Sequence, residues 1–106
     1  MLAFNGTRHC ARHPQVKLVF SGFNRALNTT RFLCPLCGTV REYSSGVITH
    51  INNARGFFFI ENGSGRDVFA HVHDLAATFV PRPGQAVEFE VTPAPKGPKA
   101  LAIRLL

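Results

Sequence analysis

The chain has 106 residues, of which 45% are hydrophobic, and twelve Lys and Arg against six Asp and Glu give it a net charge of +6. This composition is typical of a globular protein with one ordinary domain or two very small ones, and it excludes a disordered tail. The longest apolar run is Phe57–Ile60, and the first residues have no signal-peptide pattern, so we expect a cytoplasmic protein that binds no membrane. The positive charge favours a polyanionic partner such as nucleic acid.

The charge is unevenly distributed along the chain. Residues 1–44 hold six basic residues and one acidic residue, a net charge of +5, and residues 45–106 hold six basic and five acidic residues, a net charge of +1. All three cysteines lie in the first segment. We therefore predict two units, a module of residues 1–44 and a domain of residues 45–106.

The first segment contains two motifs with the spacing of zinc knuckles. Cys34 and Cys37 are separated by two residues and followed by Gly38, which lets the backbone amides turn toward the sulfur atoms. Cys10 and His13 repeat this spacing, with an imidazole in place of the second thiolate. Four Cys and His ligands with no open position form a structural Zn²⁺ site, which stabilises a fold and performs no chemistry.

A β-hairpin is predicted between the two motifs. Residues 16–20 alternate as a strand does, residues 21–28 carry turn residues, and residues 29–33 form the returning strand. Such a hairpin would bring the two motifs together. The sequence therefore predicts a small zinc-ribbon-like module, for which zinc compensates a shortage of core residues.

Other interpretations of these motifs remain open. A C-x-x-C pair also occurs in redox dithiols, but that interpretation expects a thioredoxin-like strand and helix and leaves Cys10 and His13 without a role. Three cysteines cannot all pair in disulfides, and the cytosol is reducing. His9 could replace His13 as the fourth ligand, although only His13 reproduces the two-residue spacing.

The second segment contains five short β-type runs separated by turn residues. Val87, Phe89 and Val91 alternate with Glu88 and Glu90, so one face of this run should be core and the other solvated. Leu101, Ile103 and Leu105 would likewise share one side of the last run. No helical period is present, so the pattern predicts a small barrel. The expected strands are residues 46–52, 56–60, 68–72, 86–91 and 100–105.

The second and third of these runs carry more aromatic surface than a barrel of about 60 residues can bury. Some rings must therefore face water. Exposed rings flanked by Arg55 and Arg66 provide what single-stranded bases need, which is flat surfaces for stacking and cations for phosphates. Each Phe taken alone could equally be a core residue.

Residues 46–60 read GVITHINNARGFFFI and resemble the opening motif of the bacterial cold-shock domain family, G-x-V-K-W-F-N-x-x-K-G-F-G-F-I. DVFAHV at 67–72 is similar to the family's D-V-F-V-H-F, and the G-Q-x-V-x-F and K-G-P-x-A motifs at 84–89 and 96–100 resemble its last two strands. The resemblance implies a five-stranded OB barrel that binds single-stranded RNA or DNA. The predicted nucleic-acid-binding residues, stacking side chains and flanking cations together, are His50, Arg55, Phe57, Phe59, Phe69, His71 and Lys96.

Several positions depart from the family pattern. His50 stands where the family has Trp, Thr49 where it has Lys, and Ile51 and Val72 where it has Phe. The departures predict a smaller and less basic stacking platform. Phe58 replaces a family Gly, and its role and that of Phe79 in the following loop are left open.

We conclude from the sequence that the fold is all-β and that the protein is a single-strand nucleic-acid-binding protein rather than an enzyme. No nucleophile has an adjacent base, there is no carboxylate pair or phosphate-binding loop, and the cluster of His71, His73 and Asp74 is read as accidental. The alternative is a protein-interaction adaptor that docks on RNA polymerase or the ribosome through the zinc module.

Overall fold

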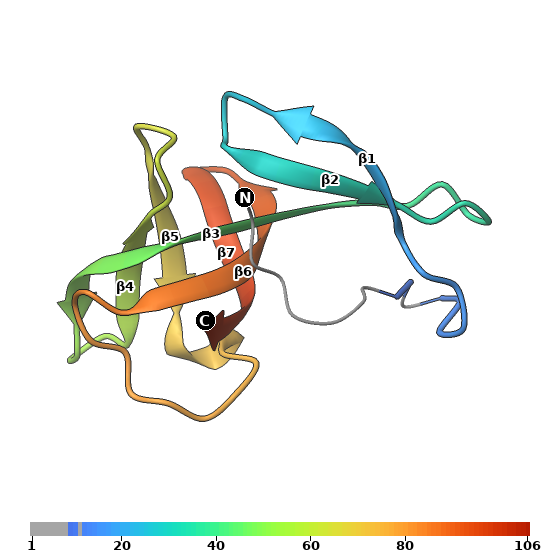
Figure 1. Ribbon diagram of the computed structural model, residues 1–106. Helices are drawn as coiled ribbons and strands as arrows, with labels where there is room; N and C mark the ends of the chain where they lie inside the picture. Colours follow the sequence, from blue (N-terminus) through green and yellow to red (C-terminus); the bar gives the residue numbers. More distant parts are fainter. Residues whose placement is uncertain (1–8, 11) are drawn as a thin grey trace.

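The computed structural model describes His9, Cys10 and residues 12–106, and this part of the chain is all-β (Figure 1). It contains one short 3₁₀ turn, η1 (Val72–Asp74), and no helix long and apolar enough to span a membrane. All named strands belong to one sheet, and they are β1 (Val19–Asn24), β2 (Thr29–Leu33), β3 (Val40–Asn52), β4 (Phe57–Glu61), β5 (Asp67–His71), β6 (Ala86–Ala94) and β7 (Gly97–Leu105).

The last five strands close into a barrel. β3 pairs with β4, β4 with β5, and β6 with β7, all antiparallel, while β5 contacts β7 in the parallel sense through Phe69 and Lys99. The ring closes because residues 42–47 of β3 also pair with β6. This arrangement confirms the predicted all-β fold class with its five-stranded, OB-like barrel.

The barrel interior is filled by alternate residues of each strand. Phe58 is fully buried between the outward-facing Phe57 and Phe59, so the residue in place of the family's glycine is a core residue. Phe79 is half-buried and packs against the same core. The buried cluster consists of Ile48, Phe58, Ile60, Val68, Ala70, Val87, Phe89, Val91, Ala100 and Ile103.

β3 is thirteen residues long and serves both the hairpin and the barrel. β2 pairs with residues 40–43 and β4 with residues 47–52, along the same edge of β3, while β6 occupies the opposite edge. The boundary predicted between residues 44 and 45 falls inside this strand. Gly46 lies where β3 approaches β4 most closely, since a Cβ there would lie 2.4 Å from the Glu61 carbonyl oxygen.

The β1–β2 turn and the β4–β5 turn meet at a seam of buried polar groups. Asn62 Nδ2 donates to the Leu27 carbonyl at 2.8 Å and to Ser44 Oγ at 3.2 Å. Ser44 Oγ donates to the Asn28 carbonyl at 2.8 Å, and Asn28 Nδ2 donates to the Asn62 carbonyl. Ser44 is fully buried and Asn62 is 5% exposed, so these hydrogen bonds replace water at the junction.

Three sequence expectations differ from the structure. β1 begins at Val19 rather than Val16 and continues to Asn24, because Gly22 with a φ of 137° accommodates a β-bulge where a turn was expected. Ala102 has a φ of 51° and lies in a β-bulge of β7, so Leu101 and Ile103 do not share a side as expected, and Ala100 and Ile103 are the buried residues. Glu88 is buried rather than solvated, and it forms an ion pair with Arg104.

Candidate nucleic-acid interface and metal centre

Three phenylalanine rings form a cluster on the outer side of β4 and β5. Phe59 lies directly opposite Phe69 in the antiparallel register, and Phe57 is two residues away on the same side of β4. The three centroid distances are 5.7, 5.8 and 5.9 Å, with Phe57 and Phe69 tilted by only 32° to each other. The family-like spacing therefore produces one continuous aromatic surface, the platform.

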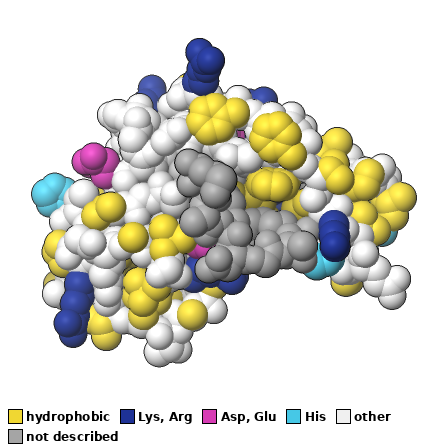
Figure 2. Space-filling model, in the orientation of Figure 1, with side chains coloured by type: hydrophobic (Ala, Val, Ile, Leu, Met, Phe, Trp, Pro, Cys, Tyr) yellow, Lys and Arg dark blue, Asp and Glu magenta, His cyan; other side chains and the backbone are white. Residues whose placement is uncertain are grey.

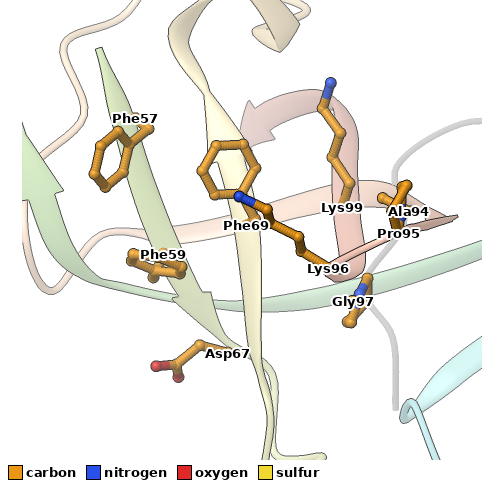
Figure 3. A pocket seen from close by; sticks show the side chains of 10 residues that line it. Phe57, Phe59, Asp67, Phe69, Ala94, Pro95, Lys96, Gly97 and Lys99 are labelled. Atoms are coloured by element: carbon orange, nitrogen blue, oxygen red, sulfur yellow. The ribbon is translucent and has the colours of Figure 1, made fainter. Parts of the chain in front are cut away.

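The platform is one wall of an open groove of about 570 Å³ (Figure 3). The opposite wall is the β6–β7 hairpin, with Pro95, Lys96 and Pro98 at its turn. The Lys96 side chain extends from this turn toward Phe69. The groove thus combines flat apolar surfaces with an exposed cation.

Asp67 and Lys99 also line the groove, although the sequence analysis did not select them as site residues. Asp67 belongs to a motif that carried the family resemblance, and that motif was the signal that could have identified it, whereas Lys99 stands at the unspecified position of its motif. Lys99 Nζ lies 3.5 Å from Asp74 Oδ2, which leaves Lys96 as the more available cation.

The other predicted contact residues surround the platform. His50 is exposed where the β3–β4 register shifts, and Arg55 is exposed in the turn between the two strands. His71 ends β5 opposite Phe57, and its Nδ1 accepts a hydrogen bond from the His73 backbone amide at 3.1 Å. The His71 and His73 rings are 4.4 Å apart, as their shared position at the strand end predicts.

The four predicted metal ligands lie together in the N-terminal module. The ligand atoms of Cys10, His13, Cys34 and Cys37 are all within 4.8 Å of one another. Cys10 Sγ is 3.6 Å from Cys37 Sγ and 3.7 Å from His13 Nδ1, which also lies 3.7 Å from Cys34 Sγ. Tetrahedral Zn²⁺ with Zn–S bonds of about 2.3 Å requires sulfur atoms about 3.8 Å apart. The geometry and the three-sulfur, one-nitrogen donor set therefore fit this metal.

Local backbone turns aim these side chains at a common centre. The Gly38 amide donates to the Cys34 carbonyl at 2.9 Å, and Gly38 adopts a φ of 74° that favours glycine. In the other motif the His13 amide donates to the Cys10 carbonyl at 3.2 Å. The Thr39 hydroxyl and backbone amide lower the pKa of Cys37 to about 6, which favours the metal-binding thiolate.

The alternatives left open by the sequence fit this geometry less well. A disulfide needs sulfur atoms about 2.05 Å apart, and Cys10 and Cys37 are separated by much more than that. His9 lies outside the group of ligand atoms and forms a backbone bridge with Lys17. The described residues contain no helix beside the C-x-x-C turn, which a thioredoxin-like dithiol would require.

Residues 44–106 match the family model described as 'Cold-shock' DNA-binding domain. Cold shock protein ScoF of Streptomyces coelicolor is 42% identical over 60 residues, which cover 54% of this chain and 90% of that protein. Cold shock-like protein CspA of Stigmatella aurantiaca is 41% identical over 64 residues, covering 58% and 94% of the two chains. Cold shock-like protein CspD of Escherichia coli is 39% identical over 61 residues, covering 55% and 82%. The match spans the barrel and confirms the resemblance noted in the sequence, and the chain belongs to the cold-shock domain family.

Proposed function

We propose that this protein binds single-stranded RNA or DNA on the outer face of β4 and β5. The observation that carries the proposal is the cluster of Phe57, Phe59 and Phe69, whose rings are exposed or half-exposed beside an open groove. Every base has a flat π-face, so such rings bind bases without strong sequence preference. A nucleic-acid-binding role is also what membership of the cold-shock family implies.

The groove supplies the remaining interactions that a single strand needs. Lys96 lines the groove at the β6–β7 turn, and Arg55 is exposed in the β3–β4 turn; we assign both to phosphate contacts and His50 and His71 to an extension of the stacking surface. Asp67 offers a carboxylate that accepts hydrogen bonds from base amino groups. An imidazole at position 50 covers less area than the family's indole, so we expect weaker stacking there.

We also propose that Cys10, His13, Cys34 and Cys37 hold one structural Zn²⁺ per chain. The four side chains leave no ligand position open, so the metal would stabilise the module and perform no reaction. Around the cluster, Leu18 and Tyr43 are buried and Val16 and Phe32 are half-buried, which is a very small core. A core of this size requires additional stabilisation such as a metal.

Fluorescence anisotropy with a labelled oligothymidine tests the nucleic-acid interface. Replacing Phe57 or Phe69 by Ala should weaken binding by about 1–3 kcal/mol, since each ring removed costs one stacked base. Leu105→Ala is the matched control, because this side chain is exposed on β7 and does not line the groove. Normal affinity in both platform variants would refute the proposed interface.

A second function, protein docking, is favoured by one observation on the zinc module. Val19, Leu33 and Val40 lie directly opposite one another across three strands, and Val19 and Val40 are 46% and 50% exposed. Leu36 in the neighbouring C-x-x-C turn is 67% exposed. An adaptor contacting transcription or translation machinery would use this aliphatic row, and it becomes the better account if no oligonucleotide binds.

A further inference from the structure

The edge strand β1 exposes two aromatic rings that the proposed interface does not use. Phe20 is 68% exposed and Phe23 is 50% exposed. Phe20 contacts the half-buried Phe32 edge-on, with a centroid distance of 6.5 Å. Rings this large are usually buried in a fold or used in binding, so their exposure on one strand requires an explanation.

These rings project from the same side of the sheet as the platform. Phe23 is opposite Thr30, and Thr30 is opposite Tyr43. Tyr43 and Val47 are four residues apart on β3 and therefore project from the same side. Val47 is opposite Glu61, and Glu61 projects from the same side of β4 as Phe59. The register from residue 42 to residue 47 contains no bulge, so this assignment of sides holds across the junction.

The two aromatic surfaces occupy corresponding places relative to β3. β2 and β4 follow one another along the same edge of β3, so β1 and β5 are each the second strand out from that edge, on either side of the seam. Phe69 is opposite Phe59, and Phe59 lies beside β3 near residue 49. Phe23 is opposite Thr30, and Thr30 is opposite Tyr43 of β3. Six residues of strand correspond to about 20 Å along β3 between these two positions.

Cations lie between and around the rings. Arg66 in the β4–β5 turn and Arg25 in the β1–β2 turn are exposed on the two sides of the seam, and neither forms an ion pair with the described acids. Figure 2 shows Lys and Arg side chains projecting at the top of the molecule, where Figure 1 places both turns. Lys17 precedes β1 and is also exposed.

Two exposed acids on this surface, Glu61 and Asp67, lie on the barrel side of the seam, whereas the acidic content of the hairpin is low. Glu42 is the one acid in residues 1–44, and it is engaged by Thr29, by Asn24 at 3.2 Å and by Arg31 at 4.0 Å. Exposed rings bracketed by unpaired cations complement a single-stranded nucleic acid, which presents alternating bases and phosphates. A protein partner would be selected by the aliphatic row on the other side of β1 instead.

We infer that the β1–β2 hairpin extends the single-strand binding surface beyond the barrel. Phe23 and Phe20 stack bases of the same strand that occupies the platform, and Arg25 and Arg66 neutralise the phosphates that cross the seam. The inference rests on the proposed function of the platform. It gives the hairpin a direct role in recognising longer single strands.

Oligonucleotides of two lengths test this inference with the full-length protein. An oligothymidine of about six nucleotides occupies the platform alone, and one of about sixteen nucleotides also reaches β1. Phe23→Ala should weaken binding of the longer strand about five-fold or more and leave the shorter strand unaffected. Val19→Ala is the matched control, since Val19 is 46% exposed on the opposite side of β1. Should Phe23→Ala unfold the hairpin, Phe23→Leu removes the ring and keeps an apolar side chain.

Each outcome separates the two proposals. Phe69→Ala should weaken both lengths, and if it weakens neither, the proposed function itself fails. If Phe69→Ala weakens binding and Phe23→Ala or Phe23→Leu changes neither length, the platform stands and the hairpin extension is overturned. An equal loss for both lengths on removal of Phe23 also overturns it, because the shorter strand does not reach β1.

Discussion

Phe57, Phe58 and Phe59 are identical neighbours in the sequence with different environments in the fold. The strand period places Phe58 in the core, with no exposed surface, and Phe57 and Phe59 outside. Phe58→Ala should lower the free energy of unfolding by about 3–5 kcal/mol, because it leaves a large cavity. Urea denaturation followed by circular dichroism measures this change.

Phe59→Ala provides the comparison for Phe58 on the same strand. Its ring contacts Phe57 and Phe69 and borders the groove, so its removal should cost little stability and weaken single-strand binding. The reverse result, with Phe59→Ala unfolded and Phe58→Ala stable, would contradict the described orientation of β4.

The ligand types and aromatic positions were largely predictable, because both follow from short-range spacing. Cys10, His13, Cys34 and Cys37 were selected by a two-residue interval, and the structure brings their ligand atoms together. The inward position of Phe58 was left open, since three consecutive rings do not reveal which of them the strand turns inward. The exposure of Phe20 and Phe23 was missed because residues 21–28 were expected to turn, which hid their common strand.

At the scale of elements, the seam between the two turns depends on one buried amide. Asn62 donates to the Leu27 carbonyl and to Ser44 Oγ, and its Oδ1 accepts from the Ser64 amide at 3.2 Å. Asn62→Ala leaves the half-buried Leu27 carbonyl and the buried Ser44 hydroxyl each with one hydrogen bond fewer. We expect a loss of about 1–3 kcal/mol in the free energy of unfolding.

Asn53→Ala is the control for the seam, since Asn53 is exposed in the β3–β4 turn. Both variants are compared by urea denaturation, and hydrogen exchange reports the amides of the β1–β2 hairpin. Faster exchange in the hairpin of Asn62→Ala alone is expected. Equal stability of the two variants would show that the seam contributes nothing.

The cluster of Cys10, His13, Cys34 and Cys37, as the proposed zinc site, is expected to be the second stabilising element of the N-terminal module. Metal analysis should find one zinc per chain, and removal of the ion by a chelator should increase hydrogen exchange in residues 12–40 while β4 and β5 remain protected. The reason is that metal binding supplies folding free energy to a module whose own core is small.

Single substitutions identify the ligands. Cys34→Ser and His13→Ala should lose the zinc, and His9→Ala should retain it, because His9 lies outside the cluster. Retention of zinc by His13→Ala together with its loss in His9→Ala would reverse the assignment of the fourth ligand.

Strand positions were predicted more accurately in the barrel than in the hairpin. The five barrel strands follow alternating runs closed by turn residues, and each begins or ends near its expected residue, apart from the early start of β3. Bulges account for most of the remaining differences. The bulges at Gly22 and Ala102 change the side on which later residues project, and neither interrupts the hydrophobic pattern enough to be recognised in advance.

At the scale of the whole molecule, the sequence did not reveal that β3 joins both halves. The change in charge near residue 44 favoured a boundary between two units, because local patterns do not show which distant strands pair. In the structure Arg41 on the first half of β3 donates to both carboxylate oxygens of Glu90 on β6, at 2.9 and 3.0 Å. The basic hairpin is therefore fixed relative to the barrel by strand pairing, by this ion pair and by the seam.

This attachment makes the salt dependence of binding a test of the whole surface. Each phosphate contact on a single strand contributes about −0.7 to the slope of log affinity against log salt concentration. Arg12, Lys17 and Arg25 are exposed cations of the N-terminal module. If all three meet phosphates, replacing them together by Gln should make the slope less steep by about 2.

Titrations of a long oligothymidine at several salt concentrations measure this slope for the wild type and the triple variant. Arg104→Gln is the control for loss of charge, since Arg104 is on β7 and is paired with Glu88 at 3.8 Å. Its slope should match that of the wild type. Stacking on the rings responds little to salt. The affinity of the triple variant should therefore lie well below that of the wild type at low salt and approach it at high salt. An unchanged slope in the triple variant would show that the module's cations do not contact the strand, and its charge would then serve another partner.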